Sequence, residues 1–384
     1  MKTSLAVVLS LALFTACSSP KSPSESSLTE PMDTKTYEFL IGTYTDSLHH
    51  GINYLSLSPN ENLLTVETIA AGIANPSYVI ATKDGSKVFA LEEEAGIAGG
   101  KVLSFSRNTQ DQTLTLIDQK DSGGDHPCHI SISPKEDFLI LSNYTGGSLS
   151  LFRIDSLGML SHVQTIQHYG KSINSDRQEK PHVHSTNFDR EGKRVIAADL
   201  GTDKLYVYQF DPSSEKSPLT LEQEFPMTPG DGPRHMAFSP AGNGLFVVEE
   251  LTATLDIFDY SSGQLTSKQR LSLLESGFTG SVGAAEVRVS PDGKFIYVSN
   301  RGEANTISVF GKRPSGEYVW VENVPSGGKM PRNFALTDDG KYLLSAHQAS
   351  NDLVVFERNP ETGKLTQTLW RASIHKPVYL HQLP

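Results

Sequence analysis

One short pattern occurs six times along the chain. The clearest copy runs from Val287 to Phe310 and reads VRVSPDGKFIYVSNRGEANTISVF, three apolar-alternating runs separated by a Ser-Pro-Asp-Gly turn and a polar loop. Such alternation is typical of antiparallel β-strands. The residue five places before the turn's proline, or its equivalent, recurs at separations of 51, 55, 51, 51 and 47 residues, at Tyr78, His129, His184, His235, Glu286 and Asn333. A period near fifty with four short strands per unit predicts a β-propeller.

The two chain ends supply one further unit. Tyr37 to Thr45 and the next two apolar runs, INYLSLS and LLTVETI, predict three strands, and Pro377 to Leu383 predicts one. Joined, these strands complete a seventh blade, which closes the ring and removes exposed sheet edges. The sequence therefore predicts an all-β, seven-bladed propeller over residues 37–384, with its last blade closed by strands from both ends.

The first 36 residues differ from the rest. Residues 1–17 read MKTSLAVVLSLALFTAC, a charged start, a short apolar run and small residues before a cysteine, which predicts a secretory signal peptide. The FTAC ending resembles the lipobox of bacterial lipoproteins, in which Cys17 would be lipidated; ordinary cleavage near Ala16 is the alternative. Residues 18–36 are rich in Ser, Pro and Thr and predict a flexible linker. We expect an exported protein of the cell envelope or periplasm, lipid-anchored through Cys17.

Composition narrows the classes of partner. The chain carries 33 basic and 44 acidic side chains, a formal net charge of −11, and no long basic run, so nucleic acid is not an expected partner. If Cys17 carries lipid, the other cysteine, Cys128, has no partner for an internal disulfide. The twelve histidines lack HExxH spacing and no CxxC occurs, so we expect neither metal nor cofactor. The glycine pairs Gly99-Gly100 and Gly146-Gly147 fit hairpin loops better than phosphate-binding loops.

Strand geometry sorts the polar residues onto one face of the ring. In a four-stranded antiparallel blade, the segment entering the first strand and the loop after the second strand lie on the same face, whereas the Ser-Pro-Asp-Gly turn lies on the other. One face therefore gathers His129, His182, His184, Arg234, His235, Glu249, Glu250, Glu286, Asn300, Arg301, Arg332 and His347. This asymmetry predicts a binding or active site at one mouth of the channel.

These residues also have structural interpretations. Histidines of this kind often hydrogen-bond a neighbouring blade or act as spacers, and the candidates are His129, His182, His235 and His347. Arg301 or Arg332 fits a structural ion pair with Glu250 or Glu286 across the channel. Acidic residues such as Asp199 and Asp203 fit turn hydrogen bonding.

Some phrases are more specific than the repeat. They include RQEKPHVH from Arg177, GPRHMAFSP from Gly232, and VSPDGKFIYVSNRG from Val289, with IGTYT, NPSY and NYTGGS nearer the N-terminus. Together they resemble the lactonase family of seven-bladed propellers, which includes bacterial 6-phosphogluconolactonases and fungal carboxy-cis,cis-muconate cyclases. The resemblance covers almost all of the chain after the linker.

The resemblance implies roles for four residues. His184 looks like the family's active-site histidine, Arg234 and Arg301 look like its anion-binding arginines, and Glu250 looks like its acid/base carboxylate. The residue before Glu250 is Glu249, where the family commonly has Asn, so the functional carboxylate is one of this pair. Neighbouring strand residues point to opposite faces, so only one should reach the channel. Further residues expected to contact substrate are His129, His182, His235, Glu286, Arg332 and His347.

The expected function is hydrolysis of a sugar lactone, as in 6-phosphogluconolactonases, without a metal. Lactone opening needs an activated water and donors for the oxyanion, which a His/Glu pair and two arginines supply. Arginine also suits a carboxylate or phosphate on the substrate. Because an exported enzyme would not meet a cytosolic sugar phosphate, we expect an unphosphorylated lactone or related anionic sugar acid, and membrane contact only through the lipid anchor. The alternatives are a muconate-type cycloisomerase and a non-catalytic surface-binding propeller.

Overall fold

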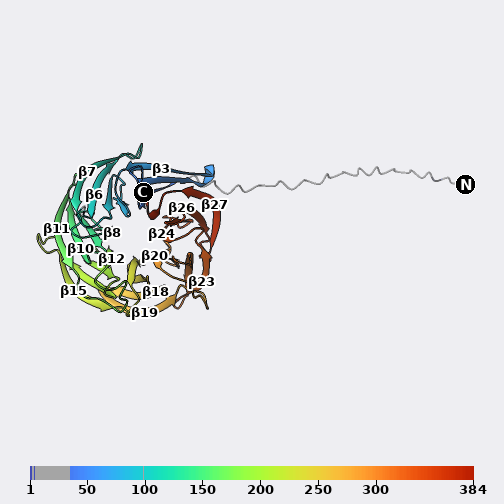
Figure 1. The fold of residues 1–384 in the computed structure, drawn as a ribbon. Helices are drawn as coiled ribbons and strands as arrows, with labels where there is room; N and C mark the ends of the chain where they lie inside the picture. Colours follow the sequence, from blue (N-terminus) through green and yellow to red (C-terminus); the bar gives the residue numbers. More distant parts are fainter. Residues whose placement is uncertain (2–3, 5–34, 98) are drawn as a thin grey trace.

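The computed structural model describes residues 1, 4, 35–97 and 99–384. Within these residues the strands form seven four-stranded antiparallel sheets, set around a central channel like the blades of a propeller (Figure 1). The prediction of an all-β, seven-bladed propeller is confirmed. The proposed lipidation site, Cys17, lies outside the described residues.

Each blade runs outward from the channel through four strands. The innermost strands are β28 (Pro377–Gln382), β4 (Val79–Ala81), β8 (Pro127–Ile132), β12 (Val183–Phe188), β16 (Pro233–Phe238), β20 (Ala284–Val289) and β24 (Pro331–Leu336). The second strands are β1 (Tyr37–Thr43), β5 (Lys87–Glu92), β9 (Phe138–Asn143), β13 (Arg194–Asp199), β17 (Gly244–Glu249), β21 (Phe295–Asn300) and β25 (Tyr342–His347). The third strands are β2 (Gly51–Ser58), β6 (Lys101–Arg107), β10 (Ser148–Ile154), β14 (Lys204–Phe210), β18 (Thr254–Ser261), β22 (Thr306–Lys312) and β26 (Asp352–Arg358). The outermost strands are β3 (Leu63–Ala71), β7 (Leu114–Asp121), β11 (Leu160–Gln167), β15 (Leu219–Pro226), β19 (Gln264–Ser272), β23 (Tyr318–Pro325) and β27 (Leu365–Ser373), and a 3₁₀ turn, η1 (Pro59–Glu61), precedes β3.

The two chain ends meet in one blade. β1 pairs antiparallel with β28, with Phe39 opposite Gln382 and Ile41 opposite Leu380. In Figure 1 the blue first strands therefore lie beside the red last blade. This arrangement confirms that the seventh blade combines both ends, and it leaves no gap in the ring.

Burial follows the position of a strand within its blade. All six residues of β21 are buried, because a second strand is covered on both faces by neighbouring blades. The outermost strand β27 alternates between more and less exposed residues, because one of its faces meets solvent. The core lies between adjacent blades, as where Ile140 and Leu151 pack with Val195 of the next blade.

Two observations bear on the predictions from the N-terminal region and the cysteines. Across the described residues, no helix has the length and apolar character of a membrane span. In the same residues Cys128 is a buried free thiol. Within the described residues, the ring is therefore closed by backbone hydrogen bonds between β1 and β28 and not by a disulfide.

Deleting residues 375–384 should destabilise the whole ring. The deletion removes β28 and with it the buried Val378, Tyr379, Leu380 and Leu383. Each such side chain stabilises by about 1.5–3 kcal/mol, so their combined loss approaches the free energy of unfolding of a typical domain. Thermal unfolding followed by circular dichroism should show a large, cooperative fall in Tm. Deleting residues 20–29, which lie outside the described residues, is the length-matched control, and an equally small effect of both deletions would contradict the role of β28.

Candidate active site

A cavity of about 270 Å³ opens at the mouth of the channel on the face predicted to carry the polar residues. Its walls come from six of the seven blades. They consist of Glu93 after β5, Cys128 on β8, Tyr144 after β9, Arg177 before β12, His184 on β12, Glu250 after β17, Arg301 after β21 and Arg332 on β24. Four residues of the predicted set, His184, Glu250, Arg301 and Arg332, therefore line one cavity.

β-Bulges in the inner strands aim side chains into this cavity. The ladder shifts register between Pro127 and His129, between Val183 and Ser185, and between Pro331 and Asn333. The extra residue in these strands is Cys128, His184 and Arg332, respectively, and all three line the cavity. A bulge adds one residue to a strand and turns its side chain out of the regular alternation. Neighbouring residues of one strand can therefore both reach the channel, at different depths.

Glu250 lies at the centre of a cluster of arginines. Its carboxylate is 2.6 Å from Arg177 Nη2, 2.9 Å from Arg234 Nε and 3.0 Å from Arg301 Nη2. Burial alone would raise the pKa of Glu250, but the charges of Arg301, Arg234 and Arg177 outweigh it and hold the pKa well below its usual range. Glu250 is therefore ionised at neutral pH and is a weak base.

Arg234 supports the cluster from below the cavity wall. Its side chain is almost fully buried and also donates from Nη1 to the carbonyl of Ala285. Burial, with the charges of Arg301 and Arg332, lowers the pKa of Arg234 to about 9. Arg301 is fixed in a similar way, because its Nε donates to the carbonyl of Gly283 at 2.8 Å. These bonds orient both guanidinium groups before any substrate is present.

Arg332 differs from the other arginines of the cavity. Its Nη2 donates to the hydroxyl of Tyr44 at 3.1 Å, and that hydroxyl donates to the carboxylate of Glu93 at 2.9 Å. Burial raises the pKa of Glu93, and the charge of Arg332 opposes that shift. In the described part of the chain Arg332 forms no ion pair with a carboxylate. It is therefore the cavity arginine whose charge is most available to a ligand.

The cavity has an excess of positive charge. Four arginines, Arg177, Arg234, Arg301 and Arg332, surround two carboxylates, Glu93 and Glu250, so the balance is at least two positive charges when both carboxylates are ionised. The whole chain, by contrast, has a formal net charge of −11. A positive cavity in an acidic protein attracts anionic ligands to this mouth.

His184 lies against the arginine–glutamate cluster. Its Nε2 is 4.0 Å from Glu250 Oε2, and its Nδ1 is 3.8 Å from the Cys128 sulfur. The Tyr144 ring packs edge-on against it, with ring centroids 5.2 Å apart. Burial, followed by the charge of Arg234, lowers the pKa of His184 well below its usual value. His184 is therefore neutral at neutral pH and can accept a proton.

Three predicted residues lie deeper in the channel and do not line the cavity. His235 Nδ1 is 3.0 Å from Glu286 Oε2, and Asn333 donates to the same oxygen. The His129 ring lies 5.5 Å from the His235 ring and 4.6 Å from the Tyr78 ring. The His184 and His235 rings are 5.2 Å apart, so this layer forms a floor beneath the cavity.

His182 and His347 also lie outside the cavity wall. His182 stacks on Tyr144, with centroids 4.5 Å apart, and its Nδ1 lies 3.1 Å from the Tyr144 carbonyl oxygen. It therefore holds a cavity residue in place. His347 has Nε2 at 2.9 Å from the Ser326 carbonyl and Nδ1 at 3.1 Å from Asp352, so it links β26 of its own blade to the segment that follows β23 of the preceding blade.

Other polar residues of this face form turns. Asp199 accepts backbone N–H groups of His182 and Gly201, and Asp203 accepts those of Gly230 and Gly232. Asn300 accepts the N–H of Gly283 at 3.0 Å. These bonds shape the loops that carry the cavity residues.

Sequence reasoning missed four residues of the wall. Glu93, Cys128, Tyr144 and Arg177 were not among the predicted site residues, although all four line the cavity. Glu93 and Tyr144 follow a second strand, which is the same position as Glu250 and Arg301, so the repeat itself held this signal. Cys128 is the residue directly before His129 on β8, and it reaches the cavity because of the bulge at this point. Arg177 comes from a long loop with no counterpart in the repeat.

The structure distinguishes the two adjacent glutamates by position. Glu250 reaches the cavity, whereas Glu249 is fully buried on the other side of its strand, where neither carboxylate oxygen has a hydrogen-bond partner. Burial, and then the nearby Asp256 and Asp231, raise the pKa of Glu249 well above its usual value. Its surroundings therefore favour the protonated form of Glu249 in the folded state.

Comparison with known proteins agrees with this combination of a seven-bladed propeller and an arginine-rich cavity. The family model described as "Lactonase, 7-bladed beta-propeller" matches residues 38–381. The chain is 33% identical to the 6-phosphogluconolactonase of Bacillus subtilis over 350 residues, which cover 89% of this chain and 98% of that protein. It is 30% identical to the 6-phosphogluconolactonase of Formosa agariphila over 330 residues, covering 85% and 93%.

A solved structure agrees as well. The periplasmic gluconolactonase PpgL of Pseudomonas aeruginosa superposes with a TM-score of 0.86 at 31% identity, over 91% of this chain and 99% of that one. The fold and the named relatives together define a β-propeller enzyme. The chain belongs to the lactonase family of seven-bladed propellers, and its relatives support a lactone hydrolase.

Replacing Glu249 by Gln should stabilise the protein in a pH-dependent way. Because the folded-state pKa of Glu249 is raised, the wild type loses stability as the pH rises above the unfolded value of about 4.3. The Tm of Glu249→Gln should match that of the wild type near about pH 4 and exceed it increasingly towards about pH 8. Glu61→Gln, on the exposed η1 turn, is the control. A constant Tm difference across this range would show that Glu249 does not carry the raised pKa.

Proposed function

We propose that the chain hydrolyses a sugar lactone in the arginine-rich cavity, with His184 as the general base. The observation that carries the proposal is the position of neutral His184 beside Glu250, which three arginines hold in its ionised form. His184 is unprotonated at neutral pH, which is the form that a general base needs, and it lines the cavity, whereas the Glu250 carboxylate is already engaged by three arginines. Glu250 then serves to orient the arginines and to stabilise the protonated imidazole.

The reaction needs no group beyond these side chains and water. Water attacks the lactone carbonyl as His184 removes its proton, and negative charge develops on the carbonyl oxygen. Arg301, which lines the cavity, stabilises this oxyanion, and the buried Arg234 adds its charge from below the wall. Both guanidinium groups are already oriented by backbone carbonyls. The ring C–O bond then breaks, and the proton on the imidazole passes to the leaving alkoxide. The product is an open-chain hydroxy acid.

The charge of the cavity bears on the choice of lactone. Arg332 has no carboxylate partner in the described residues and is the natural anchor for an electronegative or anionic part of the substrate. The names of the relatives point to sugar lactones, phosphorylated in the bacterial 6-phosphogluconolactonases and unphosphorylated in the periplasmic gluconolactonase. For an exported protein we propose an unphosphorylated sugar lactone.

Substituting His184 by Ala should reduce kcat by roughly a hundredfold to ten-thousandfold, the usual contribution of a general base. Its Tm should fall moderately, because the buried ring packs against Tyr144 and His235, so kcat is measured on the folded variant. Hydrolysis is followed by proton release over a panel of sugar lactones with and without a 6-phosphate. His162→Ala, on the exposed outer strand β11, is the matched control.

Two outcomes would contradict the proposal. Normal turnover in folded His184→Ala would remove His184 as the base. Turnover of unsaturated diacids without any lactone hydrolysis would favour the cycloisomerase reaction instead.

We also propose export with a lipid anchor at Cys17, followed by a linker and a propeller domain from residue 37. The route of the chain into the propeller supports this arrangement. Lys35 Nζ is 2.5 Å from Asp338 Oδ1, and the Tyr37 hydroxyl donates to Asp339 at 2.7 Å, in the turn between β24 and β25. That turn belongs to the face opposite the cavity. An anchored propeller would therefore keep its cavity open to solvent.

Cys17→Ser should move the protein from the membrane fraction to the soluble fraction of cells. The thiol at this position is the group that would carry the lipid, and serine cannot replace it. Fractionation and immunoblotting measure the change, and Cys128→Ser is the control with an equivalent substitution. Wild-type protein confined to the cytosol would contradict export, and soluble periplasmic wild-type protein would contradict the anchor alone.

A further inference from the structure

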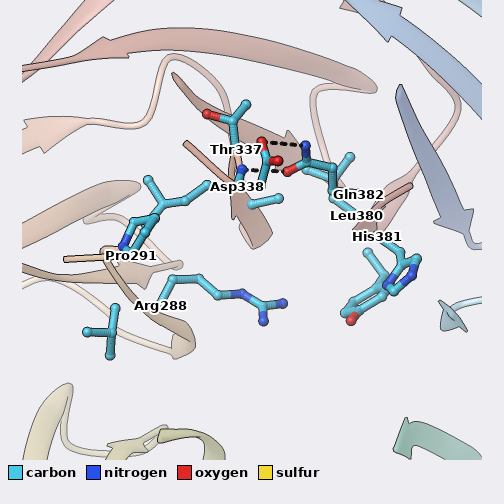
Figure 2. Close-up of a pocket in the computed structure, with 11 residues that line it drawn as sticks. Arg288, Pro291, Thr337, Asp338, Leu380, His381 and Gln382 are labelled. Atoms are coloured by element: carbon cyan, nitrogen blue, oxygen red, sulfur yellow. Dashed lines mark hydrogen bonds between the residues drawn. The ribbon is translucent and has the colours of Figure 1, made fainter. Parts of the chain in front are cut away.

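A second cavity lies at the opposite end of the channel. It is lined by the C-terminal ends of inner strands, whereas the arginine–glutamate cluster lies near their N-terminal ends. It has a volume of about 250 Å³ and lies between β20, β24 and β28 (Figure 2). Arg288 projects into it two residues beyond Glu286 on β20, and His381 lies two residues beyond Tyr379 on β28. The lactonase reaction proposed above uses none of these residues.

Arg288 has unused hydrogen-bonding capacity in this cavity. Its Nε is buried and has no hydrogen-bond partner, and its side chain as a whole is 35% exposed. Nε forms a loose ion pair with Glu286 Oε1 at 3.6 Å, too long for a hydrogen bond, and the guanidinium group also interacts with the Tyr379 side chain. The other oxygen of Glu286 is already bound by His235 and Asn333. Figure 2 shows the guanidinium group of Arg288 reaching into the open space of the cavity.

His381 adds a second donor. Its Nε2 accepts the backbone N–H of Ala81 at 3.0 Å, so in the neutral ring the proton is on Nδ1. Burial, with the charge of Arg288, lowers the pKa of His381 to about 4, so the ring is neutral at neutral pH. Within the described residues, the Nδ1–H group is then a donor with no hydrogen-bond partner.

The acceptors around the cavity are already used. Asp338 and Gln382 bind one another twice, from the Asp338 backbone N–H to Gln382 Oε1 at 2.8 Å and from Gln382 Nε2 to Asp338 Oδ1 at 3.2 Å (Figure 2). The carboxylate of Asp338 is also paired with Lys35. Arg288 and His381 therefore offer donors to a ligand, one of them charged, beside the Tyr379 side chain that interacts with Arg288.

The remaining wall is apolar. Val289, Pro291, Leu336 and Leu380 line the cavity beside Arg288. A ligand that satisfies both parts of this surface carries acceptor oxygens with a negative charge at one end and a short hydrocarbon part at the other.

We infer that this second cavity is a binding site for a small organic carboxylate. Its oxygens accept hydrogen bonds from the Arg288 guanidinium and from His381 Nδ1–H, and its hydrocarbon part lies against the apolar wall. The site does not depend on the lactonase reaction. The two cavities are connected through a chain of contacts. Arg288 pairs with Glu286, Glu286 binds His235, and the His235 ring packs against the His184 ring.

The site can be tested by NMR with propionate as the probe. Arginine Nε–H signals of the full propeller are recorded during a propionate titration, at a constant ionic strength of about 0.2 M. The signal lost in Arg288→Gln identifies Arg288. This signal should shift downfield and saturate with propionate, because an unpartnered N–H gains a charged acceptor, and it should not move with the neutral isostere propionamide. The arginines of the other cavity give their own signals, so failure here does not bear on the lactonase proposal.

Two variants make the test specific. Leu336→Phe fills the cavity from β24 without changing its charge and should weaken propionate binding at Arg288 by about tenfold or more. Ala335→Val, which also lines the cavity from β24, serves if the first variant does not fold. Arg313→Gln, an exposed arginine in the turn before β23, should leave the titration unchanged. An Arg288 signal that does not respond to propionate, responds equally to propionamide, or responds unchanged in a folded cavity-filling variant would overturn the site.

Discussion

The antiparallel pairing of β1 with β28 is the constraint on which the rest of the molecule depends. It joins residues more than three hundred positions apart and makes the seven blades a closed ring, so no sheet edge is left at a gap. Closure also fixes the distance between inner strands of different blades. The cavity takes walls from six blades, and its geometry therefore exists only when the ring is complete.

In the arginine–glutamate cluster, buried groups of opposite charge keep one another ionised. Glu250 keeps its charge because Arg177, Arg234 and Arg301 surround it, and Arg234 in turn is buried against Glu250. A buried ion pair of this kind contributes little net stability, since desolvation offsets much of the attraction. Its effect here is to set charges in position before a substrate arrives. The neutral state of His184 follows from the same burial and the same positive surroundings.

The channel changes character along its length. The end with the cluster is rich in arginine, the middle layer contains the Glu286–His235 pair, and the far end has Arg288 beside an apolar wall. Burial alone would raise the pKa of Glu286, but Arg288 and His235 outweigh it and lower the pKa to about 2. Glu286 is therefore ionised at neutral pH. The inner strands thus present three successive polar layers, each with its own charge balance.

The sequence by itself determined the fold and the face that carries the site. The fifty-residue repeat set the number of blades, and the two unmatched ends required a shared blade. Alternation along a strand gave the face, because side chains of regular strands follow a period of two. It did not give the depth of each residue. His184 and Arg332 enter the cavity through β-bulges, which break that period, whereas His235 and Glu286 lie beneath it. Glu93 and Tyr144 occupy the same repeat position as Glu250 and Arg301, so the sequence carried their signal. The places of Cys128 and Arg177 in the wall depend on a β-bulge and on the path of a long loop, which only the tertiary structure decides, because both follow from packing between blades.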